Sequence, residues 1–180
     1  MIQPHGNELI DRQVEPNRSA ELKDDFDDLT TVALDRNLLF DFANIARGVY
    51  SPLRGFMSRN DFMKVVNDLT LESGAAWPLP IVLDIETQLA DQMGPGDRIG
   101  IRGPDGTPIG IMNVDSVYRY NEEETCQNLF GTTDEDHPGV RMLQSKDPFF
   151  VGGPIKAFAD AIPRNGSHDL SPKESRVLFK

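Results

Sequence analysis

The sequence predicts an α+β fold in which a small curved sheet or barrel is flanked by several helices. Apolar residues recur at helical spacing in two segments within residues 38–69. The period then becomes that of strands, first in residues 79–85 and then in a hairpin that reverses at Pro104-Asp105-Gly106. Glycines within the hairpin strands, at positions 100 and 110, indicate the bends that a curved sheet requires.

Capping residues indicate where two of the helices begin and end. The apolar pattern of residues 38–46 stops just before Gly48, which is typical of a helix C-terminus. Ser58 stands three residues before Asp61, an arrangement that satisfies free backbone donors at the start of a helix. We expect this second helix region to close at Gly74.

The remaining elements follow from similar signals. Asn121 caps a third helix over residues 122–130, which carries three acidic residues in its first turn. The rest of the expected layout is an arm and a loop over residues 1–30, strands at 98–102 and 108–118, a loop at 131–139, and a buried strand at 149–151 that ends at Gly152-Gly153.

The segment Ser171-Pro172-Lys173-Glu174 reads as a helix N-terminus. It combines a hydroxyl cap, proline at the first helical position and a carboxylate three residues after the cap. The helix body that follows is shorter than the roughly 12 residues an isolated helix needs. We expect residues 171–180 to begin a linker or helix leading into a further domain; a short docked C-terminal helix is the alternative.

Composition narrows the classes of function. The chain has 180 residues, with 29 acidic against 18 basic side chains, for a net charge of −11. This charge repels a phosphate backbone, so we expect no nucleic-acid partner. No apolar stretch approaches the roughly 20 residues of a membrane span, so we expect no membrane partner. The single cysteine, Cys126, cannot form an intrachain disulfide, and we expect a cytoplasmic location and a buried, inert thiol.

Few residues suggest chemistry. Asp134, Asp136 and His137 lie within four residues and could ligate a metal, but their spacing fits a surface turn better, and we expect no metal site. The sequence identifies no catalytic residue. The basic residues Arg47, Arg54 and Arg59 lie close together in the sequence, and Arg54 sits in a segment of Pro, Gly and Phe. Guanidinium groups suit anions, so these three are predicted to face an anion or another domain.

A series of motifs resembles, in order, the N-terminal region of ATP sulfurylase (sulfate adenylyltransferase). The motifs are Pro4-His5-Gly6, Ser51-Pro52-Leu53-Arg54-Gly55-Phe56-Met57, Trp77-Pro78-Leu79-Pro80-Ile81, Gly131-Thr132, Asp134, His137-Pro138-Gly139-Val140, Val151-Gly152-Gly153 and Ser171-Pro172-Lys173-Glu174-Ser175-Arg176. Two positions depart from the family pattern: Asn7, where a second glycine is common, and Arg47, where a smaller residue is expected.

The resemblance implies a PUA-like domain over residues 1–170, followed from residue 171 by the passage into a nucleotidyltransferase domain absent from this sequence. The family converts ATP and sulfate to adenylyl sulfate and pyrophosphate in sulfate assimilation. Its paired histidines and glutamine-arginine-asparagine motif lie in that following domain. The resemblance therefore implies that this chain alone is inactive and carries no cofactor, that the parent enzyme uses Mg-ATP, and that its partners are the catalytic domain and further copies of the parent.

Two alternatives stay open at this point. One is a stand-alone PUA-like module that binds a protein partner or a small anion. The other is RNA binding, which rests on analogy of fold and conflicts with the acidic charge.

Overall fold

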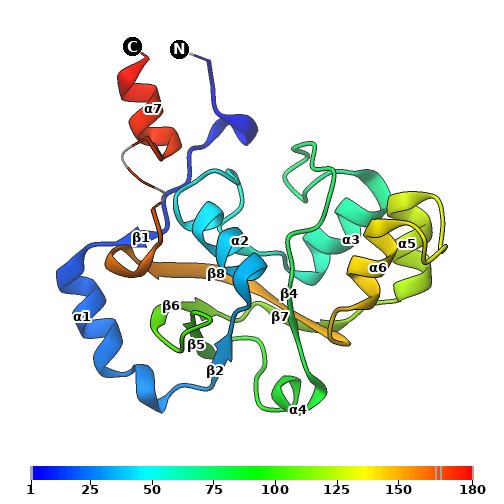
Figure 1. Ribbon diagram of the computed structural model, residues 1–180, viewed down its shortest axis with the longest axis horizontal. Helices are drawn as coiled ribbons and strands as arrows, with labels where there is room; N and C mark the ends of the chain where they lie inside the picture. Colours follow the sequence, from blue (N-terminus) through cyan, green and yellow to red (C-terminus); the bar gives the residue numbers. More distant parts are fainter. Residues whose placement is uncertain (1, 165, 167, 180) are drawn as a thin grey trace. The chain divides into compact units, whose positions relative to one another are not determined.

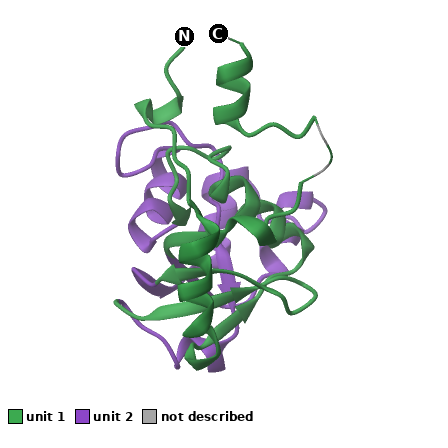
Figure 2. Cartoon of the chain, turned by 90° about the vertical axis from the view of Figure 1, so that its left-hand side faces the viewer, with its two compact units in different colours: residues 1–56, 96–113, 153–180 green, residues 57–95, 114–152 purple. Residues whose placement is uncertain are grey.

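The computed structural model describes residues 2–164, 166 and 168–179 (Figure 1). The chain consists of two compact units, within each of which the residues contact one another extensively. Each unit is built from segments that are separated in the sequence (Figure 2). Unit 1 comprises Met1–Phe56, Gly96–Asn113 and Gly153–Lys180, and unit 2 comprises Met57–Pro95 and Val114–Gly152. Strand β8 (Phe149–Phe158) contributes its first residues to the sheet of unit 2 and its last residues to the sheet of unit 1.

The sheet of unit 1 is mixed and open. Its strand order is β1-β8-β6-β5-β2, and β3 also pairs with β8. The two outer pairings, β1 with β8 and β2 with β5, are parallel, and the others are antiparallel. Since this path does not return to its first strand within the described residues, the expected curved element is a sheet and not a closed barrel. The strands are β1 Gln13–Val14, β2 Thr31–Ala33, β3 Gly55–Phe56, β5 Arg98–Arg102 and β6 Pro108–Asn113.

Unit 1 also holds the helices α1 (Pro16–Asp24), α2 (Arg36–Ala46) and α7 (Pro172–Leu178), with short 3₁₀ turns at His5–Asn7, Phe26–Asp28 and Ala159–Ala161. Helix α2 buries Phe42, Ala43, Ile45 and Ala46, whereas Leu38 and Leu39, which belong to the predicted apolar pattern of residues 38–46, are only half-buried. Its end is as predicted, because Gly48 follows with a positive φ of 80°.

The expected arm and loop over residues 1–30 is wrong, because this region contains β1 and α1. Helix α1 has a weak apolar pattern of its own and buries only Ser19. It is held instead by Leu22, which packs against a core cluster of Phe26, Ile111 and Phe158. Tertiary packing therefore stabilises a helix that the local sequence does not mark.

Unit 2 contains β4 (Leu83–Ile85) and β7 (Ser116–Arg119), which both run antiparallel to β8. Its helices are α3 (Arg59–Asp68), α4 (Thr87–Ala90), α5 (Glu122–Phe130) and α6 (Pro138–Gln144). The core centres on Phe150 of β8, whose ring stacks on Tyr120 at a centroid distance of 4.2 Å and meets Phe62 and Tyr118 edge-on. None of the helices in the described part of the chain has the length and apolarity of a membrane span.

The predicted caps of unit 2 are confirmed. The Ser58 hydroxyl accepts a hydrogen bond from the Asp61 amide, and the Asn121 side chain accepts one from the Glu124 amide. The expected end of the second helix region at Gly74 is wrong: α3 stops at Asp68, with Leu69 in the left-handed conformation.

Four other boundaries differ from the prediction. The segment 79–85 is a strand only over Leu83–Ile85, and the expected strand 108–118 divides into β6 and β7. The expected loop at 131–139 ends early because His137 caps α6 through Nδ1, which accepts from the Gly139 amide at 3.2 Å. The fourth concerns Gly152-Gly153, the predicted end of the strand at residues 149–151.

Strand β8 continues through Gly152 and Gly153 to Phe158. A Cβ atom on Gly152 would collide with the backbone carbonyl of Met57, so only glycine permits this approach. Gly153 has a φ of 153°, a conformation that side chains other than hydrogen disfavour. Gly152 therefore marks a close approach of another backbone segment to the strand, and Gly153 marks a backbone conformation that favours glycine.

Candidate functional site

The three predicted arginines occupy different environments. Arg47 follows α2 and is buried, with its side chain 7% exposed. Its Nη1 donates to the Asp169 carboxylate and its Nη2 to the Asp169 backbone carbonyl, both at 2.8 Å. Its Nε has no hydrogen-bond partner among the described residues. Arg47 thus fastens the segment before α7 to the end of α2, a role that explains why a long cation stands where a smaller residue was expected.

Arg54 lies on the surface of the same unit. Its Nη2 donates to both carboxylate oxygens of Glu8 at 2.9 Å, and both side chains are more than half exposed. The Arg54 carbonyl accepts from the Ile155 amide of β8, so the backbone at this position is fixed while the guanidinium is solvated.

Arg12 is a neighbour of Arg54 that the sequence did not reveal. Its Nε donates to the Ile155 carbonyl at 2.7 Å. Partial burial and, second, the positive charge of Arg54 lower the pKa of Arg12 from its ordinary value. The structure therefore brings Arg12 and Arg54 together beside β8.

Arg59 is the first residue of α3 in unit 2, where its backbone N–H donates to the Ser116 hydroxyl at 2.9 Å. It therefore belongs to another unit than Arg47 and Arg54. An anion-facing or interdomain role for Arg47, Arg54 and Arg59 stays a prediction.

The other candidate residues have local structural roles. The Asp134 carboxylate accepts from the Asp136 amide, as expected for a turn, and His137 caps α6. No group of three or more His, Cys, Asp or Glu side chains in the described part of the chain is placed to hold a metal ion. Cys126 is buried on α5, and desolvation, followed by the charge of Glu122, raises the pKa of its thiol. The reactive thiolate is disfavoured there.

Two concave surfaces of unit 1 lie beside α7. One surface pocket of about 560 Å³ lies between the β1 region and α7; it is lined by Asp11, Gln13, Arg164, Leu170, Ser171, Lys173, Glu174, Val177 and Leu178. A second, of about 520 Å³, is lined by Ile2, Pro172, Ser175, Arg176 and Phe179. We call the two pockets together with α7 the α7 face.

The start of α7 is the capping box predicted from the sequence. The Ser171 hydroxyl accepts from the Glu174 amide at 3.2 Å, and the Glu174 carboxylate accepts from the Ser171 amide at 2.7 Å. Arg164 also donates to Glu174 at 2.9 Å. These bonds, that from the Ser171 amide first, lower the pKa of Glu174 to about 2.

The arginine environments predict a matched pair of stability effects. Arg47→Ala leaves the partly buried Asp169 carboxylate without its guanidinium partner and should lower the free energy of unfolding by about 3 kcal/mol. Arg54→Ala removes a solvated ion pair and should lower it by less than about 1 kcal/mol. Urea unfolding of both variants measures the difference; equal losses would contradict the assigned environments.

The Glu174 contacts predict a pH dependence of the α7 cap. Because the folded pKa is lowered from 4.5 to about 2, the stabilisation is complete above pH 4.5 and is lost as pH falls from 4.5 through 2. Amide protection at Ser171, measured by hydrogen exchange and corrected for the intrinsic rate, should decline over that window. The Glu174→Ala variant is the control and should lack this decline. Identical profiles for the two proteins would exclude the capping role.

Comparison with known proteins shows that relatives match nearly all of this chain. A sulfate adenylyltransferase from Hyperthermus butylicus is 37% identical over 98% of the chain and 45% of its own length. One from Pyrococcus abyssi is 37% identical, with 98% and 46% coverage. A probable bifunctional SAT/APS kinase 2 from Sorangium cellulosum is 36% identical, with 99% and 31% coverage. The chain thus spans less than half the length of these relatives.

A solved structure and a family model also match this chain. A solved structure named hexameric APS kinase from Thiobacillus denitrificans superposes with a TM-score of 0.73 over 99% of this chain and 31% of its own. Its sequence identity of 23% makes this a similarity of fold alone. A family model described as the PUA-like domain matches residues 2–160. The chain therefore belongs to the PUA-like domain family.

Proposed function

We propose that these residues form the N-terminal, non-catalytic domain of a sulfate adenylyltransferase, which makes adenylyl sulfate and pyrophosphate from ATP and sulfate. One observation carries the proposal: relatives named sulfate adenylyltransferase match 98% of this chain, and the match accounts for only 45% and 46% of the lengths of two of them. The remaining part of such a protein would bind Mg-ATP and sulfate.

The structural roles of the basic side chains support this division of roles. His137 uses its Nδ1 to cap α6. A triphosphate needs several convergent cationic or donor groups. Among the described arginines of unit 1, Arg47 and Arg54 are each engaged by a carboxylate of the same chain.

In this proposal the domain shapes the enzyme and takes part in its contacts while the remaining part performs the chemistry. The partners are the catalytic domain and other copies of the parent enzyme in a cytoplasmic setting. Assembly into a homo-oligomer and the cytoplasmic location stay predictions.

The test compares two proteins, residues 1–180 and the product of the full reading frame that contains them. Pyrophosphate release from Mg-ATP is measured with and without sulfate. We expect sulfate-dependent release from the full product and none from residues 1–180. Turnover by residues 1–180 would overturn the proposal, as would a reading frame that stops at Lys180 or a folded full product without activity.

A further inference from the structure

Apolar side chains are uncovered on the α7 face of unit 1. Ile2 is 89% exposed, and Val177, Leu178 and Phe179 are 70%, 67% and 82% exposed. Helix α7 contains no buried residue. Four large apolar side chains so exposed in one region are typical of an interaction surface.

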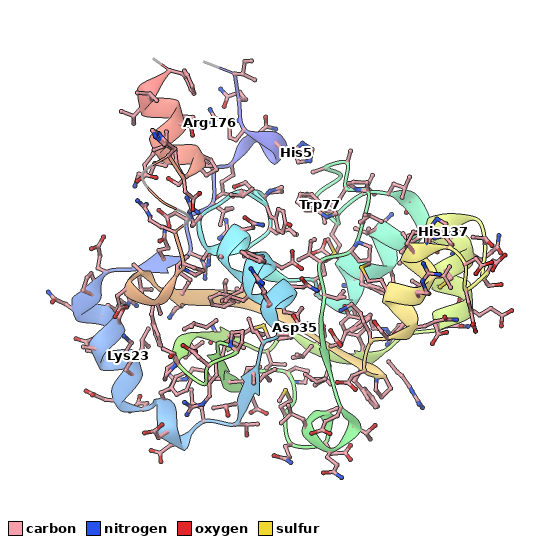
Figure 3. All side chains as sticks on the ribbon, in the orientation of Figure 1. His5, Lys23, Asp35, Trp77, His137 and Arg176 are labelled. Atoms are coloured by element: carbon pink, nitrogen blue, oxygen red, sulfur yellow. The ribbon has the colours of Figure 1, made fainter. Side chains whose placement is uncertain are left out.

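This exposed region is nevertheless held in a defined position. The capping box and Arg164 fix the start of α7. Near its end, the Arg176 Nη1 donates to the backbone carbonyl of Ile2 at 2.8 Å, which joins two segments 174 positions apart in sequence. Figures 1 and 2 both show the N-terminal segment beside α7, and Figure 3 shows Arg176 on that helix. Polar contacts therefore position the apolar side chains without covering them.

The composition of the two pockets matches the anatomy of a protein interface. Leu170, Val177 and Leu178 line one pocket, and Ile2 and Phe179 line the other. Charged side chains of both signs accompany them: Asp11, Arg164, Lys173, Glu174 and Arg176. A surface on which apolar side chains lie together with charged side chains of both signs suits a folded polypeptide better than a small polar ligand.

We propose that the α7 face is the surface on which the remaining, catalytic part of the sulfate adenylyltransferase polypeptide packs, with Ile2 as part of the contact. This inference rests on the proposed function. The catalytic part is the expected occupant because more than half of the Hyperthermus butylicus and Pyrococcus abyssi relatives lies outside the region that this chain matches. In such a protein the polypeptide that follows α7 starts directly at this face.

The test is hydroxyl-radical labelling of residues 1–180 and of the full reading-frame product at equal, low concentration. We expect labelling of Ile2 to fall several-fold in the full product, together with that of Leu178 and Phe179. Ile2 is the decisive position because it is far in sequence from any chain that follows α7. Val49, 48% exposed and also in unit 1, is the matched control and should label equally in both proteins.

A variant pair provides the second arm. In the full product, Ile2→Asp places a charge in the contact and should raise labelling of Phe179 several-fold, whereas Val49→Asp should not. Unchanged labelling of Ile2 between the two proteins would overturn the docking proposal. So would protection of Ile2 in residues 1–180 that grows with concentration, since the occupant would then be a second copy.

The two proposals fail in different ways. A full product with sulfate-dependent activity and an unprotected Ile2 excludes the docking surface and leaves the proposed function standing. A full product without that activity but with a protected α7 face excludes the sulfate adenylyltransferase assignment, while the remaining polypeptide would still be the occupant of the face.

Discussion

The pairing of strand β8 is the constraint on which the rest of the structure depends. Its first residues lie between β4 and β7 in unit 2, and its last residues lie between β1 and β6 in unit 1. Strand β3 pairs with it at Gly153 and Pro154. Each backbone donor or acceptor left unpaired in a core costs free energy, so one strand bordered on both edges organises both sheets. The cores follow from it, since Phe150 and Phe158 are fully buried side chains of the same strand.

Polar contacts in unit 1 connect strand β8 and helix α2 to the segments around them, including the segment that leads into α7. Arg12 and Arg54 bond the backbone of Ile155, and Arg47 bonds Asp169. Through that last contact the segment before α7 is fastened to the end of α2. Beyond it, α7 is positioned by its capping box, the ion pair between Arg164 and Glu174 and the hydrogen bond from Arg176 to the Ile2 carbonyl, and it contains no buried residue. Unit 1 thus combines a core built on β8 with a helix whose apolar side chains are exposed. These exposed side chains are the physical basis for assigning a partner to the α7 face.

The sequence was sufficient to predict those structural features that residues close together in the chain determine. The caps Ser58, Asn121 and Ser171 bond amides three residues away, so their motifs were sufficient. Helices α1 and α6 were missed because α1 depends on a distant core cluster and α6 begins at a histidine cap after a turn-like segment. Gly152 was wrongly predicted to end the strand. Glycine is needed there because the Met57 carbonyl comes close to the strand, and no local sequence pattern reveals that contact. Arg47, Arg54 and Arg59 were singled out because they are close in sequence, but the environments of Arg54 and Arg47 depend on Glu8 and Asp169, which lie 46 and 122 positions away.

The central claim is that the core around β8 is complete within residues 1–180, whereas α7 needs a partner that packs on its apolar side chains. Native-state hydrogen exchange on residues 1–180 tests it most directly. The account predicts that amides of β8, such as Ile155 and Ala157, exchange only by global unfolding, whereas those of Ser175 and Phe179 in and after α7 exchange by local opening. Equal protection of α7 and β8 in the isolated chain would contradict it, because α7 would then be stable without anything packed on its apolar side chains.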